Sequence, residues 1–501
     1  MRELCTALIW ISLAASLWAQ SPVQRYREEN AARILRDFAE LLSIPNLASD
    51  TPNIRRNAHY LRDAFARRGA RMELLELEGA PPIVYGQLMV PDADRTLILY
   101  VHYDGQPVDP SQWTNPPWEP TLYSGSLEDG AHKIDWPKKG DEIDPEWRIY
   151  ARGAGDDKAP LPAILTALDA LQAANIPLTS NLKFFFEGEE EAGSPHLGEY
   201  LKRYANRLQG DLWLFCDGPV HQSRRPQLVF GVRGVVSMEI TVFGATRYLH
   251  SGHYGNWAPN PGMLLAELLA SMKDEKGNVV VEGYYDSVIP LNASEKQSLA
   301  KMPAFDDQLR AELGLAATEN DNQPYMERLL VPSLNLRGLE SATVGPTARN
   351  IIPTKATASL DLRLVPGNDP QHMLDLVEAH IRAQGFYIVR QAPDRATRLA
   401  HPKIARVVRG KGYPAARTRM DLPIARRIAD AVERASGGGA LMVPTLGGSL
   451  PLYLFTETLK RPVLIVPIAN HDDNQHAPDE NLRLANLWYG IDLMGEIFTM
   501  P

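Results

Sequence analysis

The segment TLILYVHYD (residues 96–104) decides the fold. It is a short apolar run of β-forming residues that ends in polar groups, which is typical of a strand buried on both faces of a parallel sheet. The runs NLKFFFE (181–187) and DLWLFC (211–216) have the same character. Stretches with apolar residues at helical spacing, near 160–174 and 195–207, separate these runs. The alternation predicts an α/β sheet covered by helices.

The sequence pattern predicts two domains, one of which is interrupted by the other. Alternating helices and strands are predicted over residues 21–231. From 232 to 400 the strands, for example VSMEITVFG (236–244), alternate apolar and polar residues, which favours antiparallel strands with one exposed face. The α/β pattern returns over 401–501. We therefore predict an α/β domain with a mostly parallel central sheet, and a small α+β domain inserted into it.

Composition limits the classes of function. The chain has 501 residues, which favours more than one domain, and a formal net charge of -9, which gives it no electrostatic reason to bind nucleic acid. Residues 1–20 combine an apolar run with small residues near its end, as a secretory signal peptide does. The run is short for a membrane span, so we favour cleavage over an uncleaved anchor. We expect a secreted or periplasmic protein without membrane attachment, whose remaining cysteine, Cys216, is buried in a strand.

Polar residues gather where the predicted strands end. The first strand ends at His102, with Asp104 two residues later, and the third is followed by Asp217. The second strand runs into the acidic segment EGEEEAGS (187–194). Taken singly, such features are more often a capped surface histidine or a solvated charge run. Open α/β sheets, however, place their sites at the carboxyl ends of the strands, so these groups are expected to lie together.

Two further segments complete the set of candidate metal ligands. The Gly-rich segment YARGAGDDK (150–158) ends in adjacent acids, and the segment NQHAPDE (474–480) supplies a histidine. Imidazole and carboxylate ligands together suit zinc, with cobalt or manganese as alternatives. A pair of ions about 3.5–4 Å apart needs one carboxylate that binds both. The set therefore suits a metal site, and a second ion would require one of these carboxylates to be shared.

These segments, in this order, resemble those of a large zinc metallopeptidase family. The family contains carnosine dipeptidases, glutamate carboxypeptidases, succinyl-diaminopimelate desuccinylases, acetylornithine deacetylases and aminoacylases. The segments at 150–158 and 187–194 are most similar to the dipeptidase branch, and the resemblance extends from His102 to His476. It implies a di-zinc peptidase catalytic domain, with residues 232–400 forming a lid and dimerisation domain.

The resemblance also implies a role for each matching residue. Glu190 would be the general base that takes a proton from the attacking water, and Asp104 would orient a metal ligand. His250 would reach across a homodimer and stabilise the oxyanion in the neighbouring site. The peptide bond between Asp156 and Asp157 is expected to be cis. The implied ligands of two Zn²⁺ ions per subunit, with Co²⁺ or Mn²⁺ as alternatives, are His102, Asp156, Glu191, Asp217 and His476. The implied substrate-binding residues are Asn350, Arg363, Gly447, Gly448 and Ser449.

The sequence leaves more than one class of substrate open. The favoured function is exopeptidase hydrolysis of the amide bond in dipeptides or short peptides. A deacylase of N-acyl amino acids would use the same groups, and a non-catalytic binding protein on the same scaffold is less favoured because no expected ligand is missing. Thr445 and Leu446 stand where related dipeptidases often have Arg and Glu, so the substrate-binding loop differs from the family pattern.

Overall fold

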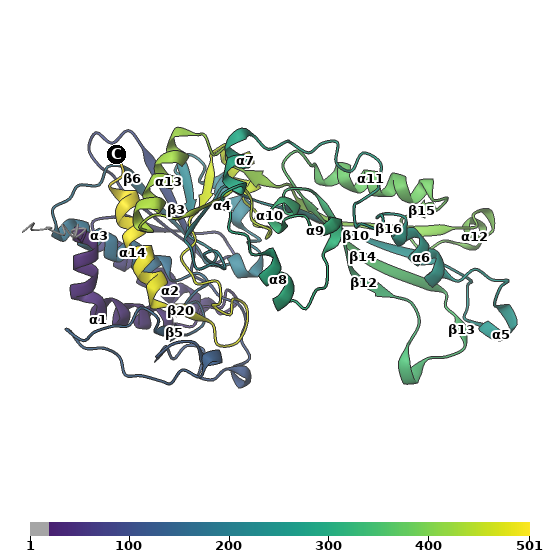
Figure 1. The fold of residues 1–501 in the computed structure, drawn as a ribbon, viewed down its shortest axis with the longest axis horizontal. Helices are drawn as coiled ribbons and strands as arrows, with labels where there is room; N and C mark the ends of the chain where they lie inside the picture. The colour runs from purple at the N-terminus through teal and green to yellow at the C-terminus, as the bar shows by residue number, and fades with distance from the viewer. Residues whose placement is uncertain (1–19) are drawn as a thin grey trace, which may run out of the picture.

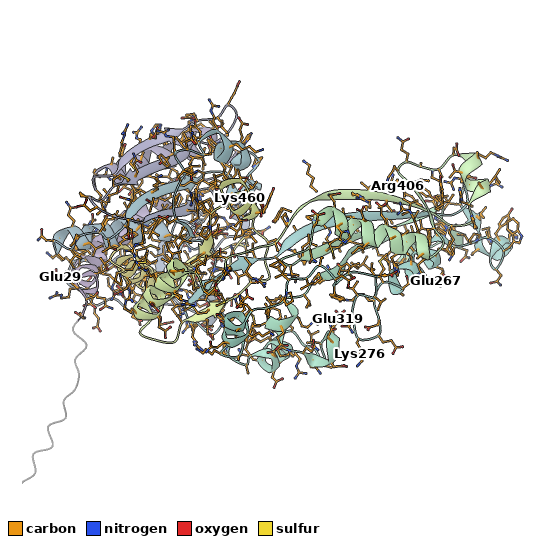
Figure 2. All side chains as sticks on the ribbon, turned by 90° about the horizontal axis from the view of Figure 1, so that it is seen from above. Glu29, Glu267, Lys276, Glu319, Arg406 and Lys460 are labelled. Atoms are coloured by element: carbon orange, nitrogen blue, oxygen red, sulfur yellow. The ribbon has the colours of Figure 1, made fainter. Side chains whose placement is uncertain are left out.

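The computed structural model describes residues 20–501 and consists of two lobes (Figure 1). Figure 2 shows the same division from above, with Lys460 on the larger lobe and Arg406 and Glu267 on the smaller one. The predicted signal peptide falls almost entirely on residues 1–19, outside the described chain. Within the described residues, none of the helices has the length and apolar character needed to cross a membrane.

The larger lobe is built on an eight-stranded mixed sheet of order β1-β2-β6-β3-β7-β19-β8-β18. Its four central strands run parallel: β6 (Asn181–Glu187), β3 (Thr96–His102), β7 (Leu212–Phe215) and β19 (Val463–Ile465). The strands predicted at 96–102 and 181–187 are confirmed, and the third is slightly shorter than predicted. The outer strands are β1 (Arg71–Leu75), β2 (Ile83–Leu88), β8 (Gln227–Val229) and β18 (Leu441–Val443).

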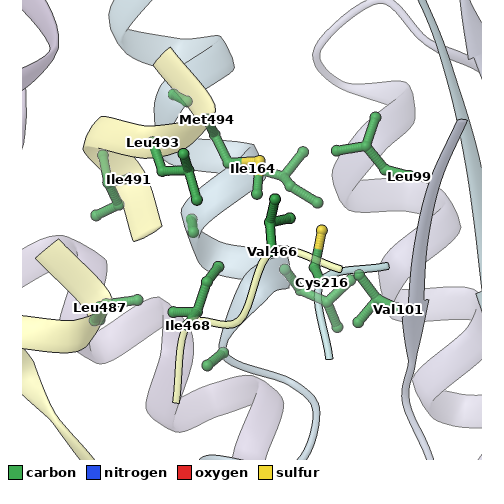
Figure 3. Packing of buried hydrophobic residues seen from close by; sticks show 14 of the residues in the cluster. Leu99, Val101, Ile164, Cys216, Val466, Ile468, Leu487, Ile491, Leu493 and Met494 are labelled. Carbon is green, nitrogen blue, oxygen red and sulfur yellow. The ribbon is translucent and has the colours of Figure 1, made fainter. Parts of the chain in front are cut away.

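The central strands are mostly apolar because helices cover both faces of the sheet. Along β3, Leu99 and Val101 enter one buried cluster, whereas Ile98 and Tyr100 enter another on the opposite face. Figure 3 shows the first cluster, in which the predicted buried residue Cys216 lies among side chains from the sheet and from two helices. The helices of this face are α1 (Pro22–Leu42), α2 (Thr51–Ala66), α3 (Pro160–Ala173), α13 (Pro423–Ala435) and α14 (Leu484–Phe498). The opposite face is covered by α4 (Leu197–Arg203) and a π-helical turn at Leu454–Leu459.

The smaller lobe contains a five-stranded sheet of order β12-β14-β10-β16-β15. The helices α6 (Pro261–Ala270) and α11 (Pro370–Ala383) pack against it and share its apolar cluster. The strands are β10 (Gly234–Phe243), β12 (Ser333–Glu340), β14 (Lys355–Leu364), β15 (Tyr387–Val389) and β16 (Ile404–Tyr413). Short helices precede β12: α7 (Ala293–Leu299), α8 (Asp306–Glu312), α9 (Glu319–Asn322) and α10 (Tyr325–Arg328).

The smaller sheet extends further along the sequence than the boundary predicted at residue 400. Strand β16 lies in the segment 401–501 that we assigned to the first domain, yet it pairs with β10 along most of its length. Its second half, RGKGY (409–413), carries no buried apolar side chain, so it lacks the alternation that would have identified a strand. The α/β pattern therefore returns only after Tyr413.

Two small sheets include or adjoin predicted site residues. At the far end of the smaller lobe, β11 (Leu249–His250) pairs with β13 (Ile351–Ile352), beside α5 (Ser251–Tyr254). In the larger lobe, the antiparallel sheet β20-β5-β4 brings together segments that are distant in sequence. Its strands are β20 (Asn481–Arg483), β5 (Arg148–Tyr150) and β4 (Thr121–Tyr123). The remaining elements include α12 (Arg395–Ala400), β9 (Gly231–Val232) and β17 (Ala416–Arg417).

Candidate active site

The carboxyl ends of the parallel strands bring the predicted ligands together. His102 is the last residue of β3, and Asp217 lies two residues beyond the end of β7. The turn after β6 carries Glu190 and Glu191. Because β6, β3 and β7 are parallel neighbours, their carboxyl ends meet at one edge of the sheet, as the sequence predicted.

Asp156 lies at the centre of the site, between two histidines. Its Oδ1 is 2.9 Å from His102 Nε2, and its Oδ2 is 3.1 Å from His476 Nε2. His476 Nε2 is also 3.2 Å from Glu191 Oε2. Potential ligand atoms of His102, Asp156 and Asp217 lie within 4.8 Å of one another, and so do those of Asp156, Glu191 and His476. One carboxylate therefore belongs to two groups of ligands, which is the arrangement that a pair of ions requires.

The peptide bond between Asp156 and Asp157 is cis, as expected. The Asp157 carboxylate turns away from the two groups of ligands and accepts a hydrogen bond of 3.2 Å from the backbone N–H of His102. Only the first of the two adjacent acids therefore faces both histidines.

The pKa values indicate a site with more negative charge than its own residues neutralise. Burial lowers the pKa of His102, but the neighbouring carboxylates, Asp156 among them, hold that pKa well above its ordinary value. Hydrogen bonds with Asp156 and Glu191 raise the pKa of His476 to about 10. Burial raises the pKa of Asp217 to about 6. Bound divalent cations would replace the protons held by these groups, so the donor set fits two metal ions.

Glu190 lies beside the ligands, and Asp104 fixes the turn that carries it. Asp104 Oδ1 accepts a hydrogen bond of 3.1 Å from the backbone N–H of Glu190, and its Oδ2 accepts one of 3.0 Å from that of Glu191. Asp104 Oδ1 is also 3.5 Å from His102 Nδ1. Burial raises the pKa of Glu190 well above its usual range. A buried carboxyl with a raised pKa, next to a site but outside its ligand set, is suited to accept a proton.

Two glutamines that the sequence reasoning missed contact the proposed ligands. Gln475 Nε2 donates a hydrogen bond of 2.8 Å to Asp156 Oδ2, and Gln106 Nε2 donates one of 2.7 Å to Glu191 Oε2. Gln475 precedes His476, and Gln106 follows Asp104 by two residues. Adjacency to the motifs was the only sequence signal for either glutamine.

Part of the predicted substrate-binding set lies at the junction of the two lobes. Arg363, on β14, donates a hydrogen bond of 2.8 Å from Nη1 to Ser449 Oγ. The backbone oxygen of Ser449 accepts a hydrogen bond of 3.1 Å from the hydroxyl of Tyr413, which the sequence did not single out. Gly447 and Gly448 belong to the same loop, which the hydrogen bond from Arg233 N to Gly448 O joins to the segment before β10. The structure therefore brings Arg363 and the Gly447–Ser449 loop together.

His250 and Asn350 are not brought to this site within one chain. They lie at the far tip of the smaller lobe, where the backbone oxygen of Asn350 accepts a hydrogen bond of 3.0 Å from Ser251 N. Figure 1 shows β13 and α5 at the end of the molecule opposite to β3 and β6. His250 is exposed, and its Nδ1 accepts a hydrogen bond of 3.1 Å from the N–H of Gly252.

A protein-family model and several known proteins match this chain over most of its length. The model of peptidase family M20/M25/M40 matches residues 98–499. A Cys-Gly metallodipeptidase of Schizosaccharomyces pombe is 26% identical over 94% of this chain and 95% of its own length. The human Beta-Ala-His dipeptidase is 26% identical over 87% of this chain and 82% of its own.

Solved structures agree with this result. An M20 family metallo-carboxypeptidase from Sulfolobus solfataricus has a TM-score of 0.72 and 27% identity, covering 93% of this chain and 98% of its own. Human carnosine dipeptidase 1 has a TM-score of 0.65 and 23% identity, covering 95% of this chain and 98% of its own, which supports the fold.

Proposed function

This chain belongs to peptidase family M20/M25/M40, and we propose that it is a di-zinc exopeptidase that hydrolyses dipeptides or short peptides. The observation that carries the proposal is that Asp156 is shared between two groups of potential ligands, with Glu190 beside them. We assign His102 and Asp217 to one ion, Glu191 and His476 to the other, and Asp156 to both.

In the proposed hydrolysis, Glu190 transfers the proton and Asp104 positions Glu190. When bound, two ions at this site would lower the pKa of a water molecule and would polarise the scissile carbonyl. Glu190 accepts the proton of the attacking water and passes it to the leaving amine. Burial raises the pKa of Glu190, which favours acceptance of that proton. Asp104 keeps Glu190 in place through the backbone of its turn.

The proposed substrate is a peptide with a free carboxylate. Arg363, together with Ser449, offers a guanidinium and a hydroxyl at the junction of the lobes, and a guanidinium binds carboxylates through paired hydrogen bonds. Relatives named as dipeptidases favour a peptide over an N-acyl amino acid.

The test of this proposal is a substrate panel on zinc-loaded protein. We expect dipeptides to be cleaved with a higher kcat/KM than N-acetyl or N-succinyl amino acids, and metal analysis to give two zinc ions per chain. A preference for the acylated compounds would favour a deacylase. Absence of both metal and turnover would favour a non-catalytic binding protein.

We propose that the enzyme is a homodimer formed through the smaller lobe. His250 and Asn350 lie at the far tip of that lobe, away from the ligands of their own chain, which favours a role in the site of a second subunit over closure onto their own. Strand β12 is the edge of its sheet and exposes Leu336 and Leu339. Exposed edge strands favour pairing, and a two-fold arrangement would be self-complementary. Sedimentation analysis tests the assembly, and a monomer at working concentration would contradict it.

We propose export with removal of roughly the first 16 to 20 residues, on the strength of the small residues that follow the apolar run. Mass spectrometry of the mature N-terminus from the native host tests this. An intact Met1 would contradict it.

A further inference from the structure

A fully buried carboxylate, Glu480, lies behind the metal ligands and accepts four hydrogen bonds. Its Oε1 accepts from the backbone N–H groups of Gly155 and Asp156, both at 2.9 Å. Its Oε2 accepts from the backbone N–H of Gly153 at 2.9 Å and from Arg152 Nη1 at 2.7 Å. The relative exposure of Glu480 is 0%. Because water does not reach it, Glu480 supplies the acceptors that these backbone N–H groups would otherwise lack.

These contacts join the two chain segments that carry Asp156 and His476. The backbone oxygen of Glu480 accepts a hydrogen bond of 3.0 Å from Ala151 N, which continues the pairing of β5 with β20. Arg152 Nη2 adds a hydrogen bond of 3.2 Å to Ala477 O, the residue after His476. The segment containing Asp156 is thus held against the segment containing His476 from both ends.

The close approach of the two segments also restricts residue 155. A Cβ at Gly155 would lie 2.7 Å from Asp473 Oδ2 and 3.2 Å from the backbone oxygen of Asn481. Only glycine lets the backbone come this near, so Gly155 and Glu480 serve the same arrangement.

We propose that Glu480 is a positioning residue that fixes the Asp156 carboxylate relative to His476 and thereby sets the affinity of the site for its two ions. The inference rests on the proposed function above. A bridging carboxylate must meet both ions at once, so a small displacement of its backbone weakens binding at both positions. Groups that orient metal ligands without touching the metal change affinity or activity roughly 10- to 100-fold when they are replaced.

The test is Glu480→Gln, which keeps the shape of the side chain but places an NH₂ group against N–H donors. Zinc is titrated into chelator-stripped protein in competition with a chromophoric chelator. We expect the zinc dissociation constants to rise roughly 10- to 100-fold. At saturating zinc, we expect kcat for a dipeptide to recover substantially and KM to stay close to that of the wild type. Zinc constants unchanged from the wild type in folded protein would overturn the inference.

The matched control is Glu378→Gln in the smaller lobe. Glu378 is also a buried carboxylate held by arginines, with Arg390 Nη1 and Arg409 Nε each 2.8 Å from its Oε1. We expect this variant to lose stability without any change in the zinc constants. An equal loss of zinc affinity in both variants would mean that Glu480 acts only through general stability, and would overturn the inference.

Gly155→Ala disturbs the segment that contains Asp156 rather than the one that contains Glu480. It tests the same inference if Glu480→Gln does not fold. It leaves Glu480 intact but pushes the backbone beside Asp156 away from Asp473. We expect a loss of zinc affinity of the same order, and unchanged affinity would overturn the inference. If the wild type itself bound no zinc, the proposed function would fail, whereas a zinc-binding wild type with unaffected variants would refute only the positioning role.

Discussion

At the residue scale, Glu190→Gln tests most directly whether Glu190 is the general base while its neighbour Glu191 binds metal. We expect kcat/KM to fall about 10²- to 10⁴-fold, the usual contribution of a general base, while two zinc ions stay bound because Glu190 lies outside both groups of ligands. The matched control is Glu189→Gln, since Glu189 contacts His196 at 2.9 Å and not the ligands. Activity near that of the wild type in Glu190→Gln, measured by initial rates, would refute its assignment as base.

Replacing the ligand that belongs to both groups should have a different effect on metal content from replacing a ligand of one group. Asp156→Ala removes the carboxylate common to both groups, so we expect loss of both zinc ions and of turnover. Asp217→Ala affects one group only, and we expect one zinc ion per chain to remain. Elemental analysis after gel filtration measures both outcomes. Full zinc occupancy in Asp156→Ala would rule out a bridging role.

At the element scale, helix α11 is tied to the smaller sheet by the carboxylate of Glu378. Burial would raise the pKa of Glu378, but hydrogen bonds from Arg390 and Arg409 outweigh it and lower the pKa to about 2. The folded-state pKa is therefore below the ordinary value of 4.5. A depressed pKa stabilises the fold fully above pH 4.5, and this stability is lost as the pH falls towards 2.

The corresponding prediction concerns the free energy of unfolding of Glu378→Gln. We expect it to be lower than that of the wild type by on the order of 2 kcal/mol at neutral pH, because charged hydrogen bonds are lost. The difference should shrink as the pH falls below about 4.5, where the wild-type carboxylate becomes protonated. Urea denaturation at several pH values measures this. A difference that is constant down to the acid range would contradict the assigned pKa.

How far the sequence predicted these elements depends on how each one is buried. Strands β3 and β6 were predicted because they are covered on both faces and are therefore mostly apolar. Strand β16 was assigned to the wrong domain because half of it is exposed and carries Arg, Gly and Lys. His102, Asp217 and the acids after β6 were predictable because strand ends converge, and the family resemblance supplied Asp156 and His476. Gln475 and Glu480 contact the Asp156 segment only through loops that the tertiary fold brings together.

At the scale of the whole molecule, the two lobes contribute different parts of the proposed site. The larger lobe carries every proposed metal ligand, and the junction carries Arg363 and Ser449. His250 lies at the opposite end of the smaller lobe, on the short strand β11. The smaller lobe places the histidine far from the proposed metal ligands of its own chain. The same placement would let it reach those of a second subunit across a two-fold axis.

This geometry predicts that two inactive variants restore activity when their subunits exchange. A His250→Ala subunit keeps Glu190 and the metal ligands, and a Glu190→Ala subunit keeps His250. If the histidine acts in trans, a mixed dimer therefore contains one intact site. Random exchange of equal amounts should give about one quarter of the wild-type kcat per subunit, since half of the dimers are mixed. His253→Ala, on the adjacent turn, is the control and should keep its activity without mixing. If native mass spectrometry confirms exchange but no activity returns, His250 does not complete the partner's site.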